Sequence, residues 1–147
     1  MQDFRRQQVW VRAHAFNLEI QRVVKSFPRV GHTERKSQLI RAADPVSSNI
    51  VEGCAAATRK EFARYLDISI KSSSEVEYRL LLARDEGILH YAAWQRLAAE
   101  IVEIRRMLFA FRRTVLATDR MEEEARKSRR RRLRETGGEQ PRPEPES

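Results

Sequence analysis

The sequence predicts an all-α protein, an antiparallel up-down four-helix bundle with a disordered C-terminal tail. Four separate stretches place apolar residues at alternating spacings of three and four, which keeps them on one side of an α-helix. The links between these stretches are short, so consecutive helices are expected to run antiparallel. The last part of the chain lacks the apolar residues of a core. We therefore expect a bundle domain over residues 1–118 and a charged tail over residues 119–147.

The first two helices are expected over Gln7–Ser26 and Thr33–Glu52. The first ends at Phe27–Pro28, because the residue before a proline is disfavoured in helical conformations. Thr33 is a candidate N-cap for the second helix, and Gly53 is expected to end it as a C′ glycine. Pro45 lies inside the second helix and removes one backbone hydrogen bond. The sequence therefore predicts a kink or a break just before it.

The third and fourth helices are expected to be long antiparallel neighbours. Thr58 and Glu61 form a capping-box pattern that opens the third helix, which then runs to Glu86 and ends at Gly87. The fourth helix follows after a very short turn and reaches about Ala117. Such a short turn forces the two helices to pack side by side.

The third apolar stretch contains serines at two core positions. Ser69 and Ser73 stand where leucine would be ordinary in the repeat. A small hydroxyl side chain allows close helix packing, and it can donate a hydrogen bond to the carbonyl four residues earlier. A close-packed midsection is the favoured interpretation. A polar pocket and a subunit contact are the alternatives.

The segment from Asp119 onward has Met121 and Leu133 as its only large apolar residues. It cannot bury enough surface to offset its ordering entropy. Up to Arg134 it can extend the fourth helix as a frayed, charged helix. Beyond Thr136 we expect disorder.

The overall charge favours an acidic partner. The 147 residues include 29 Lys and Arg against 21 Asp and Glu, a formal charge of +8. Nucleic acid is the first candidate and an anionic membrane surface the second. The sequence has no apolar run of the roughly 18 residues that a membrane span needs. Its start does not resemble a signal peptide and it has one cysteine, so we expect a cytoplasmic protein without a membrane role.

Residue patterns typical of catalysis or metal binding are missing from the sequence. His14, His32 and His90 have no partner at a spacing of four, and Cys54 has no histidine nearby. The five glycines form no phosphate-binding loop. We therefore expect no catalytic residues, no metal site, no cofactor and no enzymatic activity.

Basic residues fall into two sets. Bundle-surface cations have acidic neighbours, which favours a mixed solvated face; they are Arg59, Lys60, Arg64, Lys71, Arg105, Arg106, Arg112 and Arg113. The second set puts seven positive charges in nine residues of the tail: Arg126, Lys127, Arg129, Arg130, Arg131, Arg132 and Arg134. This set, with Arg64 and Lys71, is the candidate surface for RNA or single-stranded DNA, with affinity that falls as salt rises. The alternative is that residues 122–124, all Glu, pair with it. Without aromatic residues, it does not imply base stacking.

Two segments of the second helix, 37–43 and 46–53, resemble the four-helix bundle protein family, also known as the ribosomal S23 or 23S rRNA intervening-sequence proteins. The resemblance covers roughly residues 8–117. Its most specific element is Ser-Asn-Ile-x-Glu-Gly, and the motif residues are Ser48, Asn49, Glu52, Gly53, Lys60, Glu61 and Phe62. The chain departs from the family at Ser47, where a proline is common, and its Arg-rich tail lies outside the family domain.

The resemblance implies a homopentamer of up-down bundles without established enzymatic activity. It also implies kinship with accessory proteins of diversity-generating retroelements, which bind a reverse transcriptase and nucleic acid. We expect Asn49 and Glu52 to bond the backbone after the second helix or a neighbouring subunit, with direct partner binding as the alternative. A non-enzymatic, oligomeric, nucleic-acid-associated or accessory protein is the favoured function. A protein–protein adaptor is the alternative.

Overall fold

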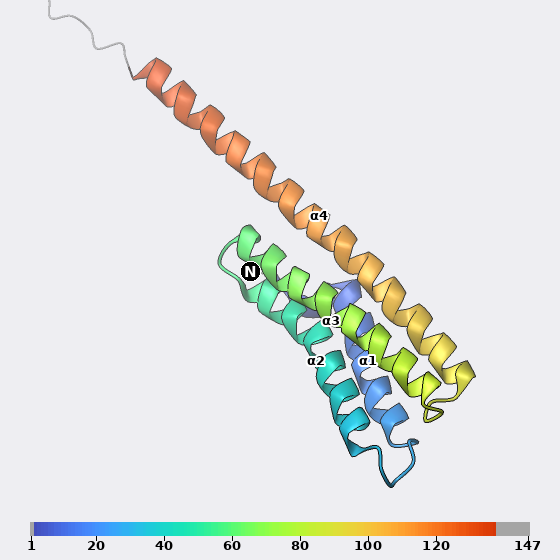
Figure 1. Ribbon diagram of the computed structural model, residues 1–147. Helices are drawn as coiled ribbons and strands as arrows, with labels where there is room; N and C mark the ends of the chain where they lie inside the picture. Colours follow the sequence, from blue (N-terminus) through green and yellow to red (C-terminus); the bar gives the residue numbers. More distant parts are fainter. Residues whose placement is uncertain (1, 138–147) are drawn as a thin grey trace, which may run out of the picture.

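The computed structural model describes residues 2–137, and within this range every regular element is helical (Figure 1). The elements in chain order are a 3-10 helix η1 (Phe4–Arg6), α1 (Gln8–Val24), α2 (Thr33–Ala55), α3 (Arg59–Asp85) and α4 (Tyr91–Thr136). The all-α prediction is confirmed.

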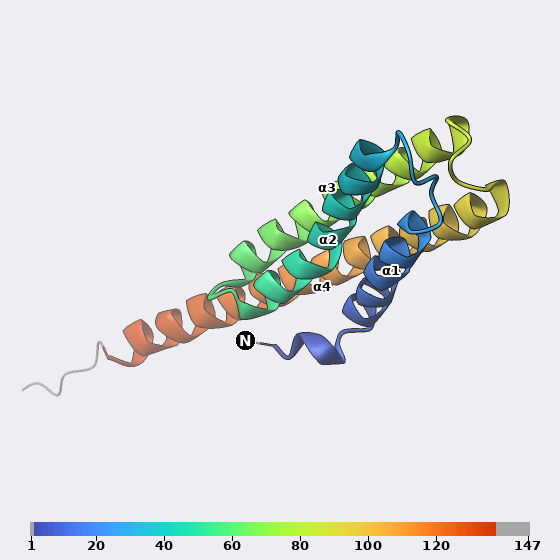
Figure 2. The ribbon, with the colours of Figure 1, turned by 90° about the horizontal axis from the view of Figure 1, so that it is seen from below.

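The four α-helices form an antiparallel bundle in which each helix packs against two others. Helix α3 makes the most extensive contacts, with α2 and with α4, while α1 contacts α2 and α4 and so closes the bundle. The view from below shows α1 beside α4 and the N-terminal segment crossing toward α2 (Figure 2). The predicted bundle architecture is therefore correct.

The predicted apolar positions form the core almost without exception. Leu66, Val76 and Leu80 of α3 and Ile101 of α4 are completely buried. Near the end of α1 the buried residue is Val24, while Val23, one position earlier, is half-buried. An α-helix has 3.6 residues per turn rather than 3.5, so residues at a strict seven-residue spacing drift slowly across the buried face. Over the two heptads from Val9 to Val23 the drift is about 40°, which carries Val23 toward the edge of the buried face while Val24 stays on it.

Helix ends follow their local chemistry. The Thr58 hydroxyl accepts a hydrogen bond from the Glu61 amide at 3.1 Å, as predicted, and Gly87 adopts φ +73° after α3. His32 rather than the predicted Thr33 is the N-cap of α2, with no side-chain capping bond. Helix α2 continues through Pro45, so the predicted break is wrong.

Gly53 does not end α2, which is a correction to the prediction. The helix continues to Ala55, and Gly53 is a buried residue within it. A Cβ atom at Gly53 would lie 2.5 Å from Phe62 Cδ2 and 3.3 Å from Tyr65 Cβ. The glycine therefore serves close packing of α2 against the start of α3, not a left-handed helix end.

The two core serines bind different carbonyls. The Ser69 hydroxyl donates to the Val46 carbonyl of α2 at 2.5 Å, and the Ser73 hydroxyl donates to the Ile70 carbonyl at 2.6 Å. Both side chains are fully buried. The close-packed interpretation is supported, and Ser69 adds a link between helices that spacing alone did not predict.

Helix α4 is much longer than the bundle. It runs without a break to Thr136, beyond the Ala117 at which the fourth helix was expected to end. Residues 119–136 are therefore helical. They form the charged extension of the fourth helix that the sequence analysis considered possible up to Arg134. The disorder predicted beyond Thr136 concerns residues 138–147, which lie outside the described part of the chain.

Candidate nucleic-acid interface

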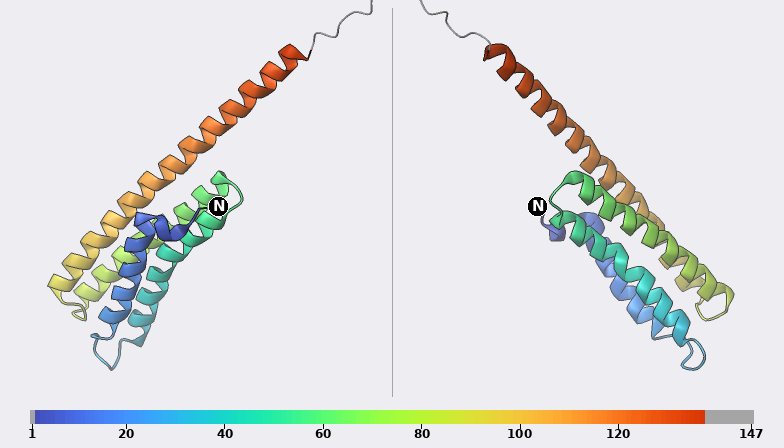
Figure 3. Two further views of the ribbon diagram at one scale, coloured as in Figure 1. Left: turned by 180° about the vertical axis from the view of Figure 1, so that it is seen from behind. Right: turned by 60° about the vertical axis from the view of Figure 1, so that its left-hand side comes forward.

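The last turns of α4 extend beyond the bundle. Arg59 Nη2, at the start of α3, lies 2.8 Å from Glu122 Oε1 of α4, and past this ion pair no helix accompanies α4. We call residues 123–136 the α4 extension. All its side chains are exposed, and further views show it clear of the other helices (Figure 3).

Most cations of the α4 extension have no acidic partner among residues 2–137. Lys127 Nζ lies 3.2 Å from Glu123, and Arg131 Nε lies 3.1 Å from Glu135. The predicted alternative, neutralisation by the Glu run, holds only for Lys127, because Glu122 binds Arg59 instead. Five arginines make no ion pair within the described range: Arg126, Arg129, Arg130, Arg132 and Arg134.

The cations of the bundle surface are mostly paired, as the mixed-face interpretation predicts. Arg105 Nη2 lies 2.7 Å from Glu77, and Arg112 Nε lies 2.6 Å from Asp67. Arg64 lies 3.8 Å from Glu61 in an exposed pair. The Arg105 and Arg112 pairs bridge α3 and α4, whereas Lys60, Lys71 and Arg113 make no ion pair within the described range.

The structure does not bring all the predicted basic residues together. Lys71 lies on α3 twelve residues after Arg59, which is about 18 Å along the helix axis and directed away from the extension. Lys60 and Arg126 line one shallow hollow of about 300 Å³ with Asp119, Glu122 and Glu123. Three carboxylates balance the two cations there, so this hollow offers no strong anion site.

Sequence reasoning missed one regular feature of α4. Cations recur every seven residues along one side, all exposed, and we call them the α4 stripe: Arg106, Arg113, Arg120, Lys127 and Arg134. The stripe starts over the bundle and ends in the extension, about 42 Å away. Arg120 was not among the predicted residues, although the seven-residue spacing could have identified it.

The family motif occupies the corner between α2 and α3 and is largely structural. The Asn49 amide donates to the Pro45 carbonyl at 2.8 Å rather than to the connection after α2, so that part of the expectation is wrong for Asn49. Gly53 and Phe62 pack against each other, and the Phe62 ring meets Phe111 of α4 edge to face at 5.2 Å. Ser48, Glu52 and Lys60 are exposed, while Glu61 is half-buried beside its Thr58 cap.

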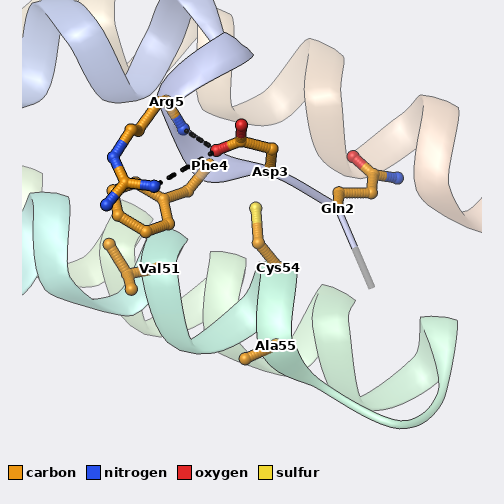
Figure 4. Close-up of a pocket in the computed structure, with 7 residues that line it drawn as sticks. All are labelled: Gln2, Asp3, Phe4, Arg5, Val51, Cys54 and Ala55. Carbon is orange, nitrogen blue, oxygen red and sulfur yellow. Dashed lines mark hydrogen bonds and ion pairs between the residues drawn. The ribbon is translucent and has the colours of Figure 1, made fainter.

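A mainly apolar pocket of about 410 Å³ lies between the N-terminal segment and the end of α2 (Figure 4). Phe4, Val51 and Cys54 line it. The backbone N–H of Gln2 donates a hydrogen bond to the Cys54 carbonyl at 3.0 Å. Burial, and next the Asp3 carboxylate, raise the pKa of the Cys54 thiol. A protonated thiol is a poorer nucleophile than a thiolate.

The histidines are separated in the structure. His14 stacks on Trp10, while His32 and His90 are the N-caps of α2 and α4. Within residues 2–137, no group of three or more His, Cys, Asp or Glu side chains is arranged to hold a metal ion. No helix in that range is long and apolar enough to cross a membrane.

Comparisons with known proteins agree with the helical-bundle fold described above. Residues 5–110 match the family described as 23S rRNA-intervening sequence protein. The chain is similar to a solved structure of a protein with unknown function from the S23 ribosomal protein family of Bacteroides thetaiotaomicron. The TM-score is 0.65 at 22% identity, covering 71% of this chain and 95% of that chain. A comparison with curated proteins gave no match. The match ends before the α4 extension.

Proposed function

We propose that this chain, which belongs to the 23S rRNA-intervening sequence protein family, is a non-enzymatic protein that associates with nucleic acid through α4. The observation that carries the proposal is the set of five arginines in the α4 extension without an acidic partner in the described range. Exposed guanidinium groups bind phosphate oxygens strongly, often with two parallel hydrogen bonds.

The expected binding is electrostatic and independent of base sequence. The chain from Arg112 to Thr136 contains no aromatic residue, so it offers no platform on which bases could stack. Displacement of counterions from phosphates therefore supplies the affinity, which must fall steeply as salt rises.

Self-association would strengthen this binding. The family resemblance favours a homopentamer, in which five extensions would act on one nucleic acid chain with a high effective concentration. Exposed aromatic side chains support self-association. Tyr78 of α3 borders a shallow pocket of about 300 Å³ with Trp94 and Ala98 of α4, and Phe109 is exposed three turns further along α4.

The same exposed aromatic side chains favour the second candidate, a protein–protein adaptor. In that function Tyr78 and Phe109 would bind a partner protein, such as the reverse transcriptase that the family resemblance implies, and the cations would only keep the chain soluble. Nucleic-acid binding that depends on the extension separates the two candidates.

Two variants with equal net charge test the proposal. The first neutralises one row of the extension, Arg126→Gln, Arg130→Gln and Arg134→Gln. The control neutralises Arg22→Gln, Lys25→Gln and Arg29→Gln, exposed residues at the opposite end of the bundle without ion-pair partners in the described range. Binding to labelled RNA and DNA is measured by fluorescence anisotropy at low salt. The first variant should bind at least about tenfold more weakly, and the control should bind like the unmodified chain. Equal loss in both would contradict the proposal.

A further inference from the structure

The cations of the α4 extension surround the helix rather than line one face. At about 100° per residue, the seven cations between Arg126 and Arg134 leave no gap around the axis wider than about 100°. Arg130 and Arg134 project to one side, and Arg129 and Arg132 to the other. No acidic residue lies between Arg126 and Arg134.

A helix with positive charge on all sides complements an environment with phosphates on opposite sides. A single strand lying along the helix would use only one row of cations. A flat anionic membrane surface would likewise contact only one side of the helix, and insertion of the helix into it would need a continuous apolar face. The exposed Met121 and the widely spaced Leu133 do not form such a face.

We propose that the α4 extension enters the major groove of a B-form DNA duplex, with cations on its two sides bound to the two phosphate backbones. This inference rests on the proposed function and narrows its ligand to a DNA duplex.

The dimensions fit this ligand. An α-helix with its side chains is about 10–12 Å across, and the major groove of B-form DNA is about 12 Å wide. The major groove of A-form RNA is deep and too narrow for an α-helix, so the fit favours B-form DNA. The extension projects about 21 Å beyond the Arg59–Glu122 ion pair, enough to lie in a groove while the bundle remains outside. The α4 stripe continues back onto the bundle and supplies further phosphate contacts at the groove entrance.

The test compares ligands first. A duplex of about 20 base pairs, as DNA and as RNA, is titrated against each of its separate strands at equal phosphate concentration and low salt, and anionic phospholipid vesicles serve as a further ligand. The full chain should bind the DNA duplex about tenfold or more tightly than either DNA strand, and more tightly than the RNA duplex and the vesicles. Equal or tighter binding of the RNA duplex would contradict docking in a wide major groove. Equal or tighter binding of single strands or vesicles would overturn the groove assignment.

The second arm removes the same charge from opposite sides. One variant carries Arg130→Gln and Arg134→Gln, and the other carries Arg129→Gln and Arg132→Gln. Glutamine preserves helix propensity, and circular dichroism checks that both variants fold. Both should lose duplex affinity by a similar factor, about tenfold or more. Loss in only one variant would indicate one-sided docking and overturn the inference while leaving the proposed function intact. A full chain that binds none of the nucleic acids would overturn both.

Discussion

At the scale of single residues, Gly53 shows how a correct motif can have an incorrectly predicted role. The sequence indicated a helix end, because glycine after a helical repeat commonly ends it. The structure places Gly53 within α2, beneath the Phe62 ring. Packing between distant segments decides this role, and spacing along one helix carries no information about it.

The Gly53→Ala substitution should destabilise the protein, although alanine is the better helix former. The new Cβ would lie 2.5 Å from Phe62 Cδ2, and Phe111 holds that ring in place. We expect a net loss of about 1–3 kcal/mol in the free energy of unfolding. In a Phe62→Ala background the clash is absent, so Gly53→Ala should cost nothing or stabilise. Urea unfolding of the four proteins measures this cycle, and an equal cost in both backgrounds would contradict the contact.

Ser69 makes a second prediction at this scale. Its buried hydroxyl donates to Val46 of α2, so Ser69→Ala should lower the free energy of unfolding by about 1 kcal/mol. Ser69→Leu, the ordinary residue of the repeat, should cost more because the helices are too close for it. Exposed Ser74→Ala is the control and should change stability little. Thermal unfolding measures all three, and a stabilising Ser69→Leu would refute the close approach.

At the scale of elements, helix positions were predictable because burial repeats along each helix. Short-range rules predict the rows of buried apolar residues on α2 and α3, the Thr58 cap and the turn at Gly87. The length of α4 was harder to predict, since no buried apolar residue follows Val115 in the described part of the helix. The extension is held by helical hydrogen bonds and by ion pairs such as Glu123–Lys127, not by a core.

The α4 extension should be the least protected helical segment of the free protein. Its like charges at spacings of three and four repel each other by about 0.2–0.5 kcal/mol per pair. We expect amides of residues 123–136 to exchange with deuterium far faster than those of α3, and to slow when a polyanion or added salt reduces the repulsion. Exchange measured by mass spectrometry tests this expectation.

Arg130→Glu sharpens that experiment. The new carboxylate can pair with Arg126 and Arg134, so exchange in the free extension should slow while binding weakens. An extension that exchanges as slowly as α3 at low salt would contradict the account.

At the scale of the whole molecule, the sequence predicted the bundle and separated the bundle-surface cations from the Arg-rich set, but it left open whether residues 122–124 neutralise that set. It could not assign the partner of each charge: Arg112 pairs with Asp67, and Glu122 pairs with Arg59 rather than with the extension. Pairing between α3 and α4 depends on their relative register. The structure therefore moves the candidate interface away from Arg64 and Lys71 and onto α4.

Assembly is also a property of the whole molecule. A pentamer should have five times the 17.3 kDa chain mass in light scattering. Tyr78→Ser together with Phe109→Ser should reduce that mass, because both are exposed aromatic side chains proposed to support self-association. Arg22→Gln, Lys25→Gln and Arg29→Gln should leave it unchanged. A monomer at all concentrations would remove the multivalency from the proposed function.

The most direct test of the central claim, that free cations of α4 bind phosphate, is the salt dependence of nucleic-acid affinity. On duplex DNA each phosphate contact contributes about 0.9 to the slope of log affinity against log salt. Neutralising Arg126, Arg130 and Arg134 should therefore reduce the slope by roughly 2–3. The matched variant at Arg22, Lys25 and Arg29 should keep the full slope. Equal slopes in the three proteins, or affinity that ignores salt, would contradict the account.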